Sequence, residues 1–206
     1  MGAAEVKGTI DSAPIVRIID ASLDEKGFEY DTTDATYEKL TASGVQIEGS
    51  PHYPKTTGEF FDALNGPGEF NTLLLVAHGE VTAGDNNGEA VRVKTADLIC
   101  PWLLLAQADA ELQDKLVLLA VCGGLCDDTI WTFIRGNQLA LFLVGSTEKV
   151  TGAEVEAFVP PFLAELKAVA TSGGSFNPEQ VRQALEKCNP AANNKFDFYS
   201  GVGELE

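Results

Sequence analysis

Two runs of consecutive apolar residues constrain the fold of this chain more than any other feature of its sequence. Phe70–His78 reads FNTLLLVAH and Lys115–Cys122 reads KLVLLAVC, without the polar–apolar alternation of a half-exposed strand. Such runs are typical of strands buried on both faces, as in a parallel sheet. Pro14–Ala21 and Leu139–Ser146 are similar runs. The sequence therefore predicts a mostly parallel sheet, which needs helices on both faces.

Segments with helical spacing or capping residues lie between these runs. Helices are expected over Asp34–Ser43, Thr57–Asn65, Thr95–Leu105, Asp127–Arg135, Thr151–Ala170 and Pro178–Cys188. Asn177 is the expected N-cap of the last helix, and Pro160-Pro161 is expected to kink or split the helix before it. Short strands are expected at Val45–Glu48 and Phe196–Tyr199, and a hairpin within Gly79–Val93. The alternation predicts one α/β domain over residues 1–206, with a core of about 14–200.

The chain is strongly acidic, and this narrows its partners. Its 206 residues include 31 acidic and 14 basic side chains, a formal net charge of −17. Such a surface repels nucleic acids and anionic membranes, so neither is expected as a partner, whereas a cationic substrate is attracted. No apolar run is long enough for a membrane span, and Met1–Lys7 does not resemble a signal peptide. Four cysteines do not indicate a disulfide framework here, so a reducing cytoplasm is expected.

His78 and Cys122 stand at the ends of the two apolar runs. If these strands are parallel neighbours, both residues emerge at the carboxyl edge of the sheet, where functional groups of α/β proteins gather. A cysteine attacks a carbonyl as its thiolate, and a nearby histidine takes the thiol proton and later protonates the leaving amine. Gly79 follows the histidine, and Gly123-Gly124 follow the cysteine. We expect these glycines to form tight turns that expose amides to a developing oxyanion.

This pattern resembles the caspase-like (clan CD) cysteine peptidases, most closely the bacterial CHAT-domain and metacaspase-type proteins. Cys122-Gly123-Gly124 fits the C-[RQG]-G part of the caspase motif, and His78-Gly79 lies 44 residues upstream. The resemblance spans roughly Pro14 to Leu166 and implies a three-layer caspase-hemoglobinase-like fold. It implies a cysteine endopeptidase that cleaves a peptide or protein substrate with a His78–Cys122 dyad. The backbone N–H groups of Gly79 and Cys122 would hold the oxyanion, and no metal or organic cofactor would be required.

The specificity implied by this resemblance is not that of the caspases. The glutamine of their aspartate-specific pocket is replaced by Ala120 in this chain. Several relatives prefer Lys or Arg before the scissile bond and bind it with acidic residues. Asp20, at the end of the first apolar run, is placed to do this, while Asp127 and Asp128 are weaker candidates. Asp20 and Ala120 are therefore the expected substrate-pocket residues.

Two other functions fit the same residues. The elbow Ala120–Gly124 matches a DJ-1/amidotransferase-like cysteine hydrolase equally well, and only the upstream His78-Gly79 favours the peptidase. A catalytically inactive interaction module on the caspase-like fold is the third reading. A tyrosine phosphatase is excluded because no arginine stands six residues after either Cys122 or Cys126. A Rossmann dinucleotide site is excluded because no G-x-G-x-x-G follows the first strand. His52 and Cys126 are expected to have packing roles, and no residue argues for an oligomeric state.

Overall fold

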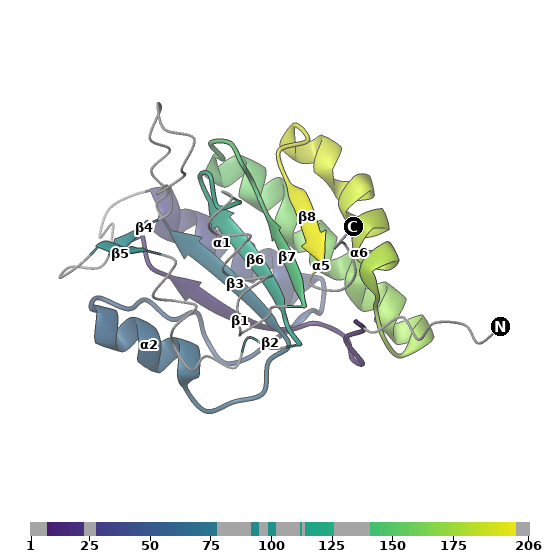
Figure 1. The fold of residues 1–206 in the computed structure, drawn as a ribbon, viewed down its shortest axis with the longest axis horizontal. Coiled ribbons are helices and arrows are strands. Elements are labelled where there is room, and N and C mark those ends of the chain that lie inside the picture. Colours follow the sequence, from purple (N-terminus) through teal and green to yellow (C-terminus); the bar gives the residue numbers. More distant parts are fainter. Residues whose placement is uncertain are drawn as a thin grey trace, which may run out of the picture.

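A six-stranded sheet forms the centre of the molecule. The computed structural model describes residues 8–22, 28–77, 92–94, 99–101, 112, 114–125 and 141–200. The strands of the sheet are β1 (Ile15–Asp20), β2 (Gln46–Ile47), β3 (Thr72–Ala77), β6 (Leu116–Val121), β7 (Phe142–Gly145) and β8 (Asp197–Ser200). Their order is β2-β1-β3-β6-β7-β8, and every pair is parallel except β7 with β8 (Figure 1). The predicted α/β class and mostly parallel sheet are confirmed.

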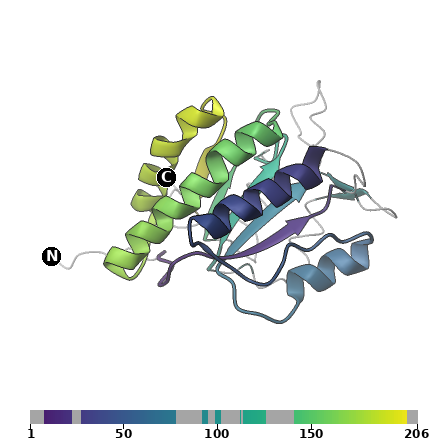
Figure 2. The ribbon, with the colours of Figure 1, turned by 180° about the vertical axis from the view of Figure 1, so that it is seen from behind.

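Helices cover both faces of this sheet, as expected. They are α1 (Phe28–Ala42), α2 (Thr57–Asn65), α5 (Gly152–Gly173) and α6 (Pro178–Cys188), followed by the 3-10 turn η2 (Asn189–Ala192). Helices α1, α5 and α6 lie over one face, and α2 lies over the other (Figures 1 and 2). Two separate apolar clusters fill the space between these layers. No helix within the described ranges combines the length and apolarity that crossing a membrane requires.

The two central strands are buried along their whole length. All six residues of β3 and all six of β6 are buried, as their continuous apolar sequences predict. Their side chains alternate, so that Leu74 and Val76 join the α1–α5–α6 cluster while Leu73 and Leu75 join the α2 cluster. The strands are in register from the pair Thr72–Leu116 to the pair Ala77–Val121. This register fixes which residues follow them at the carboxyl edge.

Capping residues set the helix boundaries. Asn177 caps α6 through a capping box with Gln180, and Thr56 caps α2 by accepting the N–H of Glu59. Both helices have the predicted bounds. Helix α1 begins at Phe28, earlier than the expected Asp34, and α1 and β2 otherwise overlap the predicted segments.

Helix α5 continues through Pro160-Pro161, so the expected split is wrong. Each proline costs an internal helix about 3 kcal/mol or more, because it removes a hydrogen bond and crowds the preceding turn. The same stretch buries four large side chains, each contributing about 1.5–3 kcal/mol. These are Phe158, Val159, Phe162 and Leu163. Burial against the sheet therefore outweighs the local cost, and one helix results.

The expected helix over Thr95–Leu105 is wrong where it can be compared. Ile99–Pro101 forms strand β5, which pairs antiparallel with β4 (Arg92–Lys94) in a separate two-stranded sheet. Pro101 has no N–H for a helix interior, but it is tolerated as the last residue of a short strand. The rest of that segment, the hairpin turn within Gly79–Val93 and the helix expected over Asp127–Arg135 lie outside the described residues.

Candidate functional site

Cys122, one member of the predicted dyad, follows β6 directly at the carboxyl edge of the sheet, beside the end of β3. Ala77 and Val121 are the last residues of these strands, and they are paired directly across the sheet. The chain continues from Ala77 into His78 and from Val121 into Cys122. His78 and Gly79 lie outside the described residues, so the dyad and its oxyanion hole stay predictions. Because Ala77 and Val121 are neighbours in the sheet, the residues that precede His78 and Cys122 lie side by side.

This edge is also a topological switch point. From β1 the chain crosses to β2 on one side, whereas β3, β6 and β7 follow one another on the other side. The connections therefore diverge between β1 and β3, and crevices for ligands form outside the carboxyl ends of strands at such points. Asp20 ends β1, and its register partner Val76 pairs in turn with Ala120. Strands β1 and β6 thus bring the candidates Asp20 and Ala120 into one row, with Val76 of β3 between them.

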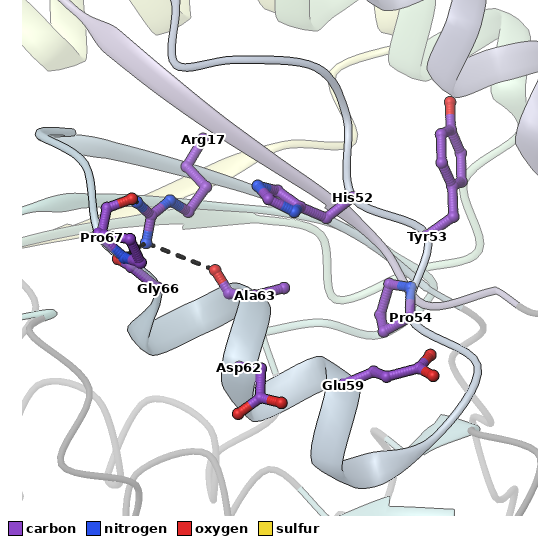
Figure 3. A pocket seen from close by; sticks show the side chains of 9 residues that line it. All are labelled: Arg17, His52, Tyr53, Pro54, Glu59, Asp62, Ala63, Gly66 and Pro67. Carbon is purple, nitrogen blue, oxygen red and sulfur yellow. Dashed lines mark hydrogen bonds between the residues drawn. The ribbon is translucent and has the colours of Figure 1, made fainter.

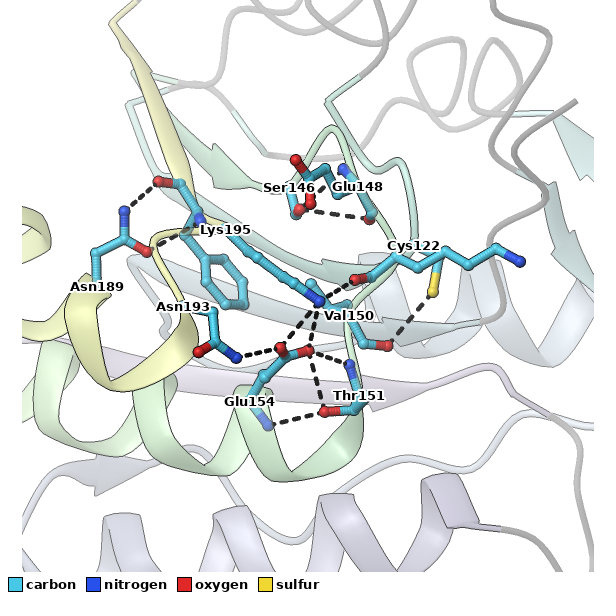
Figure 4. A network of polar contacts seen from close by, with 11 residues as sticks. Cys122, Ser146, Glu148, Val150, Thr151, Glu154, Asn189, Asn193 and Lys195 are labelled. Carbon is cyan, nitrogen blue, oxygen red and sulfur yellow. Dashed lines mark hydrogen bonds and ion pairs between the residues drawn. The ribbon is translucent and has the colours of Figure 1, made fainter. Parts of the chain in front are cut away.

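Cys122 sits at the start of a tight turn with its side chain partly exposed. Its Sγ donates a hydrogen bond to the carbonyl oxygen of Val150 at 3.5 Å (Figure 4). Gly123 follows with a φ of +64°, a conformation that side-chain-bearing residues rarely adopt. The thiol is therefore presented on a turn whose shape depends on a glycine, next to the segment that follows β7.

The amides of Gly123 and Gly124 are occupied, which corrects the expectation that they face an oxyanion. The Gly123 N–H donates to the Glu148 carbonyl at 2.9 Å, and the Gly124 N–H donates to the Val121 carbonyl at 3.1 Å. A third bond, from the Leu125 N–H to the Ser146 carbonyl at 3.0 Å, completes the turn. These amides hold the turn in place. For the oxyanion, the candidates remain the N–H groups of Gly79 and Cys122.

Asp20 is buried to 1% exposure, yet only half of its carboxylate is satisfied. Its Oδ1 accepts the N–H of Ser22 at 2.9 Å and the Ser22 hydroxyl at 2.5 Å. Its Oδ2 has no hydrogen-bond partner among the described residues, and neither do the buried hydroxyls of Thr33 and Thr36 on α1. An unpartnered buried polar atom costs about 1–3 kcal/mol, so each of these three atoms is a candidate contact for a group outside the described residues.

Asp20 and Ala120 share the face of the sheet that α1 covers. Val16 and Ile18 belong to the apolar cluster under α1, and strand alternation places Asp20 on the same side. Ala120 belongs to that cluster too. The two expected pocket residues are therefore on one side of the sheet and in one row with Val76. Asp127, Asp128 and Cys126 lie outside the described residues.

A pocket of about 480 Å³ opens on the opposite, α2 side (Figure 3). His52 and Arg17 line one wall, and the carboxylates of Glu59 and Asp62 project from α2. The backbone of His52 extends the sheet, because its N–H donates to Ile18 at 2.9 Å and its carbonyl accepts the Asp20 N–H at 2.8 Å. Asp20, Ala120 and Cys122 are not among the described residues that line this pocket.

A polar network anchors the segment that receives the Cys122 thiol (Figure 4). Glu154 forms an ion pair with Lys195 at 2.9 Å and accepts the Asn193 amide at 2.7 Å. It also accepts the Thr151 N–H at 2.8 Å and the Thr151 hydroxyl at 3.0 Å. Burial alone raises the pKa of Glu154, but the bonds from Lys195, Asn193 and Thr151 outweigh it and lower the pKa from 4.5 to about 2. Glu154 is therefore ionised at neutral pH.

Sequence reasoning missed this network and the two α1 threonines. Thr151-x-x-Glu154 is a capping-box motif, and it could have located the helix start and the carboxylate. Lys195 carries no comparable signal, since its partners are more than 40 residues away in the chain. No group of three metal-ligating side chains occurs within the described ranges. Burial raises the pKa of the Cys188 thiol on α6, which fits an inert packing role.

Comparisons with known proteins add little to this geometry. No protein-family model matches the chain, and no curated protein sequence matches it. Among solved structures, a flavodoxin of Streptococcus pneumoniae TIGR4 is similar over 75% of this chain and 98% of its own, with 15% identity and a TM-score of 0.41. A likeness at this TM-score carries no conclusion about the family or function of this chain.

Proposed function

We propose that this protein is a cysteine endopeptidase of the caspase-like type, with Cys122 as nucleophile and His78 as general acid and base. The pairing of Ala77 with Val121 carries the proposal, because the two reactive residues follow these partners by one position each. The mostly parallel sheet with helices on both faces supports the three-layer caspase-hemoglobinase-like fold. The free thiols of Cys122 and Cys188 support a reducing, cytoplasmic environment.

The proposed reaction needs two proton transfers to form the thioester, and two more when His78 takes a proton from water and returns it to the Cys122 sulfur. His78 removes the thiol proton, and the Cys122 sulfur forms a bond to the carbonyl carbon of the substrate. The backbone N–H groups of Gly79 and Cys122 stabilise the oxyanion. His78 then protonates the leaving amine as the C–N bond breaks, and water hydrolyses the thioester to regenerate the thiol. No metal or organic cofactor takes part in this scheme.

The substrate residue before the scissile bond is proposed to be Arg or Lys. The unpartnered Asp20 Oδ2 offers a carboxylate oxygen to a cationic head group, and the hydroxyls of Thr33 and Thr36 offer two more acceptors in the same layer. Ala120 replaces the bulkier glutamine of the caspases on this side of the sheet. The net charge of −17 also favours the approach of basic peptides.

Fluorogenic peptides with Arg, Lys, Asp or Leu before the reporter test this proposal. The unmodified protein is expected to release the reporter after Arg and Lys, while Cys122→Ala and His78→Ala abolish release. Cys188→Ala is the matched control, because it removes a buried thiol far along the chain and should leave activity unchanged.

Three results decide against the proposal. If the folded protein hydrolyses none of the peptides, the remaining explanation is a catalytically inactive interaction module. Full activity of Cys122→Ala removes the proposed nucleophile. A glyoxalase activity that needs Cys122 but not His78 identifies a DJ-1-like hydrolase instead.

A further inference from the structure

The segment 146–151, between β7 and α5, covers the turn that carries Cys122. Its carbonyl groups accept three bonds from that turn: Glu148 from the Gly123 N–H, Ser146 from the Leu125 N–H, and Val150 from the Cys122 thiol. The distances are 2.9, 3.0 and 3.5 Å in that order. The position of the nucleophile is therefore tied to the position of this segment.

Lys195 holds the same segment from its other side. Its ammonium donates to the Lys149 carbonyl at 2.8 Å and contacts both oxygens of Glu154 at 2.9 and 3.0 Å. Glu154 in turn accepts the N–H of Thr151, where the segment enters α5. Figure 4 shows the lysine stem reaching across to the segment that faces Cys122. Lys195 thus binds the segment directly at Lys149 and indirectly at Thr151, through the Glu154 carboxylate.

The contact with Val150 selects one form of the cysteine. A thiol can donate its hydrogen to a carbonyl oxygen, whereas a thiolate has no hydrogen to give and faces the negative end of the carbonyl dipole. In this structure the Cys122 sulfur therefore lies against a carbonyl oxygen, in a contact that a thiol can make and a thiolate cannot. A nucleophile needs the thiolate, so this contact has to be lost before attack.

We propose that Lys195 and Glu154 are positioning residues that clamp segment 146–151 against Cys122 and keep the thiol latent until the segment shifts. This rests on the proposed function insofar as Cys122 is the nucleophile. The clamp persists at neutral pH, since Glu154 stays ionised well into the acid range. Only a displacement of the segment, such as entry of a substrate at this edge, then opens it.

Alkylation of Cys122 by iodoacetamide tests the clamp without any need for peptidase activity. The rate is followed by mass spectrometry of the tryptic peptide 116–135 in a Cys126→Ser background, so that this peptide holds one thiol. Lys195→Met removes the ammonium and keeps most of the stem. Lys187→Met is the control, because Lys187 forms a more exposed ion pair, with Glu165 at 2.6 Å, that involves no residue of segment 146–151.

Lys195→Met is expected to alkylate at Cys122 about fivefold faster at neutral pH, the factor that corresponds to one lost hydrogen bond. The pH at which alkylation reaches half of its maximal rate should fall as well, because the carbonyl contact no longer opposes the thiolate. Glu154→Gln should move both quantities in the same direction if the lysine variant folds poorly. Alkylation of the buried Cys188 reports general loosening and should not accelerate.

An unchanged rate and pH profile relative to Lys187→Met overturns the clamp, and so does acceleration of Cys122 and Cys188 together. Faster alkylation of Cys122 in a protein that cleaves no peptide supports the clamp and removes the peptidase. Peptide cleavage together with an unchanged alkylation rate in Lys195→Met supports the peptidase and removes the clamp. The two proposals therefore fail separately.

Discussion

Arg17 and Asp20 are charged residues of the same strand, equally buried at 1% exposure, but their surroundings differ completely. On the α2 side, the Arg17 guanidinium pairs with both oxygens of Glu48 and donates to the carbonyls of Leu64 and Gly66 at 3.0 and 3.1 Å. It also lies over the ring of Phe70, 4.0 Å from the centroid. On the α1 side, one oxygen of Asp20 has no partner among the described residues.

This difference separates a structural charge from a candidate functional one. A buried cation with all of its donors used fixes the elements around it, here the C-terminal end of α2 and the residues near β2. A buried carboxylate with an unused oxygen costs stability, and such cost persists mainly where a ligand recovers it. Mutation of Arg17 should therefore lower the stability of the fold, whereas mutation of Asp20 should mainly affect activity.

Arg17→Met should give the largest loss of stability, about 3–5 kcal/mol, because Glu48 keeps its charge in a mostly buried position and several carbonyls lose their donor. Urea unfolding of this variant and of Lys187→Met measures the effect. The control breaks an exposed pair and should cost about 0–1 kcal/mol. A cost below about 1 kcal/mol for Arg17→Met would show that the buried pair does not organise this side of the sheet.

Asp20→Asn should leave the fold almost unaffected and remove the preference for basic residues. We expect kcat/KM for the Arg peptide to fall about 100-fold, corresponding to the loss of one charge-assisted hydrogen bond. Slow residual hydrolysis of the Leu peptide is the internal control, and its rate should change little. Equal losses on both peptides would instead indicate that Asp20 supports the structure, as Arg17 does.

Glu154 is a buried carboxylate like Asp20. Unlike Asp20, it has hydrogen-bond partners for both of its oxygens. Its folded pKa of about 2 lies below the usual 4.5, so its stabilisation is complete above pH 4.5 and is lost as the pH falls toward 2. Because the Lys195 side chain is 23% exposed and solvent weakens the pair, we expect this stabilisation to be about 2 kcal/mol. Unfolding of wild type and Glu154→Gln at pH 7 and pH 2.5 should show that difference shrink with acid.

The matched variant for this experiment is Glu165→Gln, which breaks the exposed pair with Lys187. Its stability difference from wild type should be small at both pH values. If Glu154→Gln shows an equally small difference at pH 7, the carboxylate is not held as the contacts indicate.

Thr36→Val should have the smallest effect and the opposite sign. The hydroxyl of Thr36 is fully buried without a partner among the described residues, so an isosteric methyl group should stabilise the fold by about 1 kcal/mol. Thr41→Val on the same helix is the control, since that hydroxyl is exposed and bonded to the Tyr37 carbonyl. Destabilisation by Thr36→Val would mean that an ordered water or another group satisfies the hydroxyl. The polar atoms on the α1 side would then be satisfied, as those around Arg17 are.

Local sequence signals explain what could be predicted of the fold. The apolar runs gave β3 and β6, helical spacing gave the bounds of α2, and the expected cap Asn177 gave the start of α6. Local signals misled where long-range packing decides. Helix α5 survives two prolines because its other residues are buried against the sheet.

The site divides along the same line. Strand ends and a glycine after Cys122 are local features, and they placed the cysteine at the carboxyl edge in advance. The occupied amides of Gly123 and Gly124 depend on carbonyls that include Glu148, and the anchor of that segment is Lys195. Pairings between residues so far apart leave no periodicity or motif, so they could not be predicted from the sequence.

The hydrogen bond between Cys122 and Val150 can form only late in the synthesis of the chain. Ribosomes deliver a chain from its N-terminal end, so the strand before Cys122 is made well before segment 146–151 and Lys195. During that interval the thiol has neither its carbonyl acceptor nor the covering segment. An uncovered thiol is open to oxidants and to other thiols. Oxidation of Cys122 can therefore compete with folding until segment 146–151 covers the turn that carries it.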